Sequence, residues 1–170
     1  GDGESAEGSV WEAAEIGAHH ALDSLCGITD VNGLGQSGPS VWSHDTEAYA
    51  AKWRAFGWHS SVVDGHDLQA LLDAFDAARQ TRGRPTMILA RTIKGKGISI
   101  AEGKPGWHGK AFKKGEELDK VLEELASQLV AEDAPARPPG PRRDGASGPP
   151  QAQRPAPRKG PLVAVEGDQR

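Results

Sequence analysis

Two polar residues near the start of the chain have the types and surroundings that are needed to hold a cation. Asp2 lies in Gly1-Asp2-Gly3-Glu4, directly before a helical pattern, and Asn32 follows a strand-like pattern about thirty residues later. Carboxylate, amide and backbone carbonyl oxygens suit Mg²⁺ or Ca²⁺, and a diphosphate held by glycine backbone and a helix N-terminus can complete the ligand shell. By itself, the Asp-Gly pair is more typical of an ordinary turn than of a cation site.

Two basic side chains further along the chain are also candidates for chemistry. Lys94 lies in a glycine-rich loop, where a fixed ammonium can pair with anionic groups, and His108 can donate or shuttle a proton. Taken alone, Lys94 is more typical of a solvated loop lysine, and His108 is ambiguous. His19 and His20 are adjacent on a helix, so their side chains should point about 100° apart and not share a metal. Cys26 is expected to be a small buried apolar group.

The elements that must position these residues alternate along the first 132 residues. Apolar residues at helical spacing predict helices over 9–26, 45–56 and 116–130, and a further helix headed by Asp67 and stopped by the turn at 82–85. A compact apolar run predicts a strand over 86–90, and further strands are predicted over 58–63 and over 27–31, the last weakened by Thr29 and Asp30. This order predicts an α/β fold with a parallel sheet and helices on both faces. Loops 1–5, 32–38, 64–67 and 91–97 then meet at one edge, where such sheets bind ligands.

Composition changes sharply after residue 132. Residues 1–132 hold 13 basic and 20 acidic side chains, whereas residues 133–170 hold 7 basic and 4 acidic side chains and nine of the twelve prolines. The sequence therefore predicts two parts, a domain over 1–132 and a disordered Pro/Arg/Gly-rich tail over 133–170. A linker, a proline-rich ligand and a shifted reading frame are alternative explanations of the tail.

Net charge, hydropathy and cysteine content limit the classes of function. The formal charge of −4 gives no general attraction to nucleic acid, and no apolar run is long enough for a membrane span. A single cysteine fits a reducing compartment, so we expect a cytoplasmic protein. The chain begins with glycine and has its only methionine at Met87, so we expect it to be a fragment.

Four segments, in this order and spacing, resemble the diphosphate-binding domain of transketolases, which are thiamine-diphosphate enzymes. They are Gly1-Asp2-Gly3-Glu4 with Glu7 to Ala13, Asn32 to Ser37, Phe56 to His59 with Val63 to His66, and Lys94 to Gly97 followed by Trp107 to Lys110. Each segment is unremarkable alone, but the combination is specific and covers roughly residues 1–130. The resemblance implies a partial thiamine diphosphate-binding fold.

The resemblance also implies a role for each matching residue. Asp2, Asn32 and the main-chain carbonyl of Leu34 would hold a divalent ion, Mg²⁺ or alternatively Ca²⁺. Gly3 and Asn32 would contact the diphosphate of thiamine diphosphate, and Lys94 would lie near the cofactor. His108 would reach both the diphosphate and the substrate, which makes it the implied catalytic residue.

The activity implied by the family is transfer of a two-carbon ketol unit from a ketose phosphate to an aldose phosphate in the pentose phosphate pathway. The complete enzyme would act on sugar phosphates as a homodimer, and this segment would supply only the cofactor anchor, without turnover of its own. Two alternatives stay open. One is another thiamine-diphosphate ketolase or synthase, and the other is a non-catalytic binding or assembly module that retains the fold.

Overall fold

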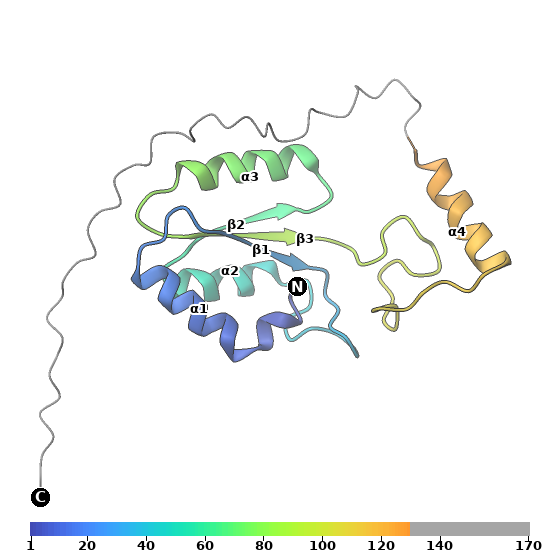
Figure 1. Ribbon diagram of the computed structural model, residues 1–170, viewed down its shortest axis with the longest axis horizontal. Helices are drawn as coiled ribbons and strands as arrows, with labels where there is room; N and C mark the ends of the chain where they lie inside the picture. The colour runs from blue at the N-terminus through green and yellow to red at the C-terminus, as the bar shows by residue number, and fades with distance from the viewer. Residues whose placement is uncertain (130–170) are drawn as a thin grey trace, which may run out of the picture. The chain divides into compact units, whose positions relative to one another are not determined.

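The computed structural model describes residues 1–129, and its centre is a three-stranded parallel sheet (Figure 1). The strands are β1 (Cys26–Val31), β2 (His59–Asp64) and β3 (Thr86–Arg91), in the order β1-β3-β2. The central strand, β3, is buried along five of its six residues, as expected for a strand with neighbours on both sides and helices on both faces. The predicted parallel α/β fold is confirmed.

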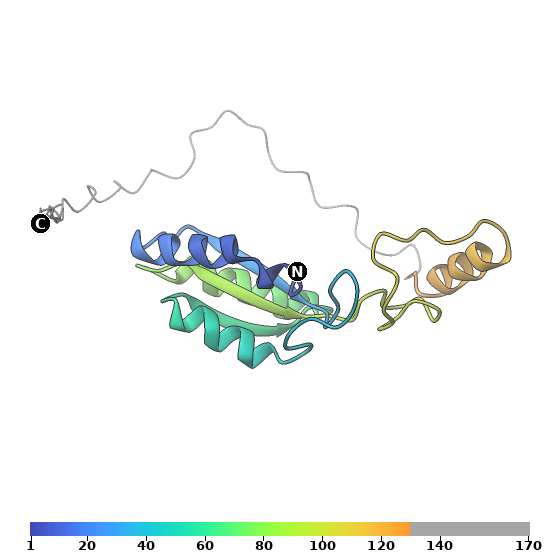
Figure 2. The ribbon, with the colours of Figure 1, turned by 90° about the horizontal axis from the view of Figure 1, so that it is seen from below.

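Four α-helices accompany the sheet in the described part of the chain. Their bounds are α1 (Gly8–His19), α2 (Thr46–Ala55), α3 (Leu68–Gln80) and α4 (Glu116–Ser127), and a short 3-10 helix, η1 (Glu4–Ala6), precedes α1. Figures 1 and 2 show α1 and α2 on one face of the sheet and α3 on the opposite face. The predicted N-terminal cap of α3 forms, because the Asp67 carboxylate accepts backbone N–H bonds there, and Asp45, predicted to begin a helix, caps α2 in the same way.

The main core lies between the sheet and the helix pair α1 and α2. It is rich in aromatic side chains, and its buried members are Ala14, Val31, Tyr49, Ala50, Trp53, Trp58, Met87 and Leu89. Trp58 donates its indole N–H to the Ala14 carbonyl at 2.8 Å, which joins the start of β2 to α1. Val31, the last residue of β1, belongs to this core, so the core also holds the point at which the following loop begins.

The first helix is shorter than the sequence pattern predicts. Helix α1 ends at His19 rather than at residue 26, because Ala21 adopts a left-handed backbone conformation (φ +49°) and the chain turns into β1. Cys26 begins β1 and is exposed, so the expectation that it is a buried apolar group was wrong. Helix α4 ends at Ser127, three residues before the predicted end.

The three strands end at the same level. Val31 pairs with Arg91, and Asp64 pairs with the same residue from the other side of β3. The loops after the three strands therefore start side by side, as the sequence predicts.

None of the helices within residues 1–129 is long and apolar enough to cross a membrane. The predicted boundary at 132 and the tail over 133–170 lie outside the described residues.

Candidate functional site

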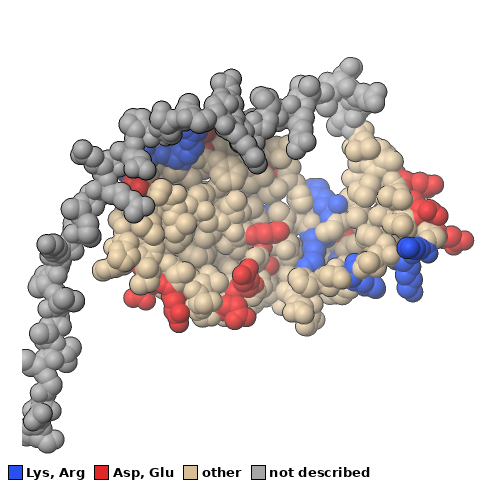
Figure 3. Space-filling model, in the orientation of Figure 1, with Lys and Arg blue, Asp and Glu red and all other residues tan. Residues whose placement is uncertain are grey.

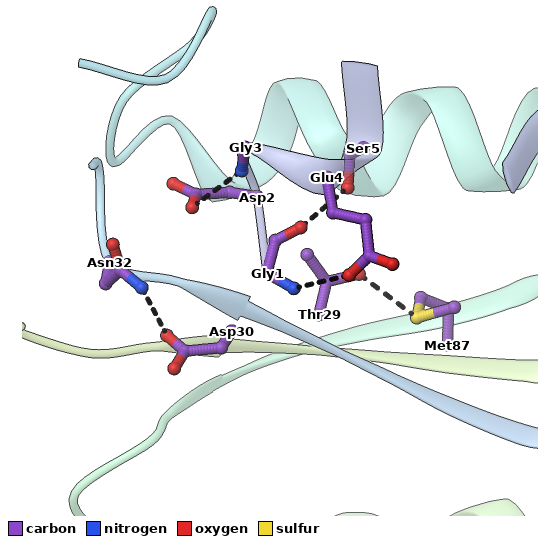
Figure 4. Close-up of polar contacts among 9 residues, drawn as sticks. All are labelled: Gly1, Asp2, Gly3, Glu4, Ser5, Thr29, Asp30, Asn32 and Met87. Atoms are coloured by element: carbon purple, nitrogen blue, oxygen red, sulfur yellow. Dashed lines mark hydrogen bonds and ion pairs between the residues drawn. The ribbon is translucent and has the colours of Figure 1, made fainter. Parts of the chain in front are cut away.

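Asp2 is the most buried charged residue at this end of the sheet, with 3% of its surface exposed. Its backbone N–H donates to the Asp30 carbonyl at 2.9 Å, which holds the start of the chain beside the end of β1 (Figure 4). One carboxylate oxygen, Oδ1, accepts the Gly3 N–H at 3.0 Å. The other, Oδ2, accepts the Gly33 N–H at 2.8 Å and the Ser40 hydroxyl at 2.6 Å. These donors offset the cost of burying the carboxylate.

The Asp2 carboxylate retains capacity to bind a cation. A carboxylate has about four acceptor positions, and three are filled. Within residues 1–129 no Lys, Arg or His side chain lies within 4.0 Å of it. The charge of Asp2 is thus held by neutral donors alone, an arrangement that favours a positively charged ligand at the free position.

Asn32 and Leu34 present further oxygens at the same end of the sheet. Asn32 follows β1; its amide group donates to Asp30 Oδ1 at 3.3 Å, and its Oδ1 accepts the Leu34 N–H at 3.0 Å. An amide oxygen has two lone pairs, so one stays available. No donor among residues 1–129 bonds to the Leu34 carbonyl oxygen. The oxygens that the family resemblance assigns to a divalent ion are therefore present, and each keeps a lone pair that accepts no hydrogen bond.

Two glycines allow the backbone to pack closely here. A Cβ on Gly3 would lie 3.0 Å from the Gly35 Cα, so a side chain at residue 3 would fill the space between these loops. Gly33 has a φ of +79°, a left-handed conformation that favours glycine, and a Cβ there would meet the His44 ring at 3.0 Å. Close packing of this kind holds the start of the chain against the loop after β1.

Lys94 and His108 form a second polar group, carried by the long loop between β3 and α4. Lys94 Nζ lies 3.1 Å from His108 Nδ1. For the ammonium to donate there, Nδ1 must be unprotonated, which leaves the ring proton on Nε2. Figure 3 shows basic side chains gathered beyond the ends of the strands, where this loop begins.

One cavity of about 450 Å³ brings the predicted site residues together. Its lining includes all six of them: Asp2, Gly3, Asn32, Leu34, Lys94 and His108. We call this space the anchor cavity. The donor set for a cation is made only of oxygens, which fits Mg²⁺ or Ca²⁺. Lys94 and His108 add positive charge or N–H donors, which fit a diphosphate.

Ser40 and His44 belong to this site but were missed from the sequence. Ser40 is buried and donates to Asp2 across 38 residues of chain. His44 Nε2 lies 2.9 Å from the Thr92 carbonyl, and its ring packs against Gly33, so it joins the loop after β1 to the loop that carries Lys94. No spacing rule marks either contact. The only local signal for His44 was its position just before the Asp45 helix cap.

The other residues considered from the sequence do not form a metal site. Within the described residues, no three His, Cys, Asp or Glu side chains come together as ligands. The His19 and His20 rings touch edge to face, with centroids 5.0 Å apart, rather than diverging, because α1 ends at His19. In the Asp64 to Asp67 turn, the Asp64 carboxylate accepts the His66 N–H and Asp67 caps α3.

Comparison with known proteins identifies the class of protein. Residues 1–128 match the family model described as transketolase, thiamine diphosphate binding domain. The chain belongs to the transketolase family, whose members are enzymes.

Individual relatives agree with this assignment. The chain is 47% identical over 129 residues to transketolase-like protein 2 of Bos taurus and 43% identical over 129 residues to human transketolase. Each match covers 76% of this chain and 20% of the relative. A crystal structure of transketolase from Pichia stipitis, in complex with fructose 6-phosphate, matches with a TM-score of 0.51 and 30% identity. That match covers 56% of this chain and 14% of the other. The chain thus spans about a fifth of the length of the curated relatives.

Proposed function

We propose that residues 1–129 anchor the diphosphate end of thiamine diphosphate through a divalent cation, with Mg²⁺ as the expected ion and Ca²⁺ as the alternative. The observation that carries this proposal is the buried Asp2 carboxylate, which is held only by neutral donors and keeps one acceptor position free beside Asn32 and Leu34. In this account Asp2 Oδ, Asn32 Oδ1 and the Leu34 carbonyl oxygen are the protein ligands of the ion.

The remaining residues of the anchor cavity would bind the diphosphate itself. Gly3 and Asn32 both line the anchor cavity, where the Gly3 backbone and the Asn32 amide would contact phosphate oxygens. Lys94 would neutralise phosphate charge, and His108, with its proton on Nε2, would donate a hydrogen bond toward the diphosphate or the substrate. When bound, the cofactor supplies the electron sink for cleaving a carbon–carbon bond next to a carbonyl.

The reaction of the complete protein is proposed from the family. It is the transfer of a two-carbon ketol unit from a ketose phosphate to an aldose phosphate, in the pentose phosphate pathway and within a homodimer. A Pichia stipitis relative has been solved with fructose 6-phosphate, which supports sugar phosphates as substrates. We expect the 170-residue chain alone to be inactive in a coupled assay with xylulose 5-phosphate and ribose 5-phosphate. The cytoplasmic location stays a prediction.

Two alternatives to a transketolase activity stay open. Another thiamine-diphosphate ketolase or synthase would use the same anchor with a different acceptor, which product analysis of a complete protein would reveal. A non-catalytic binding or assembly module would retain the fold without turnover.

Calorimetric titration distinguishes the proposed cofactor anchor from a non-catalytic module. We expect thiamine diphosphate to bind the 170-residue chain in the presence of Mg²⁺ and to lose most of its affinity when the ion is chelated. Asp2→Asn, which keeps the size of the side chain, should abolish the dependence on Mg²⁺. Binding that is absent, or that is equally tight in chelator, would refute the anchor and leave the module.

A further inference from the structure

A second cavity, of about 270 Å³, lies between the start of the chain and α2. It shares Asp2 with the anchor cavity, but its other walls are different and more apolar. Ala6, Val41, Trp42 and Tyr49 supply apolar surface, and Lys52 supplies a charge. None of these five residues has a part in the proposed cofactor anchor.

The Lys52 ammonium is fixed but has no counterion. Its Nζ lies 3.5 Å from the centroid of the Trp11 ring and 5.4 Å from that of Trp42, so the two indoles hold it in place by cation–π attraction. No carboxylate in the described part of the chain comes within 4.0 Å of it. The Asp2 carboxylate, the other charged group of this cavity, accepts bonds from the Gly3 and Gly33 N–H groups and the Ser40 hydroxyl and forms no ion pair with Lys52. A positioned cation without a partner favours an anionic ligand.

The loop before α2 has further features of a binding surface. Val41 is 75% exposed and Trp42 is 37% exposed, so large apolar side chains face solvent at this cavity. The next residue, Ser43, has a φ of +48°, a strained conformation for a residue with a Cβ. Tyr49 packs edge to face on Trp42 at 5.0 Å, and its enclosed hydroxyl has no partner within residues 1–129.

We propose that the second cavity binds a small planar monocarboxylate, with its carboxylate on Lys52 and its ring against Val41 and Trp42. The volume of about 270 Å³ equals that of roughly nine waters, at about 30 Å³ each, so it admits a single-ring acid of the size of benzoate but not a nucleotide. This binding activity goes beyond the proposed cofactor anchor and does not depend on it.

The test is an NMR titration of the 170-residue chain with benzoate, observed at the indole N–H signals of its five tryptophans. We expect saturable shifts for Trp11 and Trp42 and none for Trp107, which packs against Phe112 in the loop before α4. Lys52→Met should weaken binding at least tenfold, Lys52→Arg should restore most of it, and Lys120→Met on α4 should change nothing. Benzamide, which has the same shape without the charge, should bind at least tenfold more weakly than benzoate.

Three results would overturn the proposal: no saturable shift at 20 mM benzoate, equal affinity for benzamide, or unchanged affinity in Lys52→Met while circular dichroism shows an intact fold. Benzoate affinity should also be unchanged in Lys94→Met, a variant that alters only the anchor cavity. This comparison distinguishes a failure of the second cavity from a failure of the cofactor anchor.

Discussion

The two walls of the anchor cavity are built in different ways. One wall is formed by Asp2 and Asn32 and is supported from behind by Gly33 and Ser40, which donate to Asp2. These four residues, here the Asp2 wall, are mostly buried and are joined by hydrogen bonds between segments about 30 to 40 residues apart. The wall formed by Lys94 and His108, here the Lys94 wall, has one polar contact of 3.1 Å between its two side chains. The proposed cation end is therefore preformed by the fold, whereas the proposed phosphate end has freedom to adjust.

The backbone supports the same contrast. Between Arg91 and Glu116 the chain forms no helix or strand, and six of the nine glycines with positive φ in the described residues lie in this stretch. The Asp2 wall instead starts directly from the end of β1, which pairs with β3 along six residues. Substitutions on the first wall should accordingly affect both folding and ligand binding, whereas substitutions on the second should affect ligand binding alone.

The largest effect is expected for Asp2→Ala. It leaves the Gly3 and Gly33 N–H groups and the Ser40 hydroxyl without an acceptor, so the free energy of unfolding should fall by about 3 kcal/mol. Urea unfolding followed by circular dichroism measures this, with Glu12→Ala on the exposed side of α1 as a control that should change stability by less than about 0.5 kcal/mol. A loss below about 1 kcal/mol would show that the Asp2 wall is not preformed by these bonds.

Lys94→Met should give the opposite pattern. We expect thiamine diphosphate affinity to fall about thirtyfold, which corresponds to the ~2 kcal/mol of a charge-assisted hydrogen bond, while the free energy of unfolding stays within about 0.5 kcal/mol. His108→Gln should behave in the same way with a smaller loss. Lys96→Met, an exposed lysine of the same loop, is the matched control for charge. If Lys94→Met unfolds the chain, or Lys96→Met weakens binding equally, the two walls do not differ as described.

Ser40→Ala tests a residue that belongs to the Asp2 wall but not to any motif. Loss of its 2.6 Å bond to Asp2 should lower the free energy of unfolding by about 1.5 kcal/mol and weaken Mg²⁺-dependent binding less than Asp2→Asn does. Ser37→Ala, at an exposed position of the same loop, should leave both quantities unchanged. Equal effects of the two serine substitutions would remove Ser40 from the site.

The smallest effect concerns the contact that holds the Lys94 loop to α4. The Ser99 hydroxyl and backbone N–H donate to the Glu124 carboxylate, which lowers the pKa of Glu124 below its ordinary value of 4.5. Because the folded-state pKa is depressed, the contact stabilises the fold above about pH 4.5 and is lost as the pH falls through the folded-state pKa. NMR titration of the Glu124 carboxyl should show this, and Ser99→Ala should return the pKa toward 4.5. An unchanged pKa in Ser99→Ala would refute the contact.

The contrast between the walls also explains what the sequence could predict. The strands over 26–31 and 86–91 were predicted to within a residue, because turns bound their short apolar runs, and their parallel pairing followed from the helices between them. That pairing placed Asp2 and Asn32 at one end of the sheet. The family motif then identified Lys94 and His108, which local patterns could not distinguish from surface residues.

What the sequence could not predict depends on tertiary contacts. The end of α1 was missed because the left-handed turn at Ala21 has no glycine to signal it. Apolar residues at helical spacing predicted α3 but not which of them are buried: Leu68 and Leu72 are mostly exposed, and the smaller Ala74 and Ala78 are buried. Ser40 was missed because its hydrogen bond joins positions far apart in the chain.

The most direct test of the central claim is to locate a divalent ion on the chain in solution. Mn²⁺ can replace Mg²⁺ at oxygen sites, and it broadens the NMR signals of nearby protons. With thiamine diphosphate present, substoichiometric Mn²⁺ should selectively broaden the Asn32 side-chain amide and the backbone amides of Gly3, Gly33 and Leu34, and Asp2→Asn should remove the effect. Uniform broadening, or broadening centred on His19 and His20 instead, would contradict a cation site shared by Asp2 and Asn32.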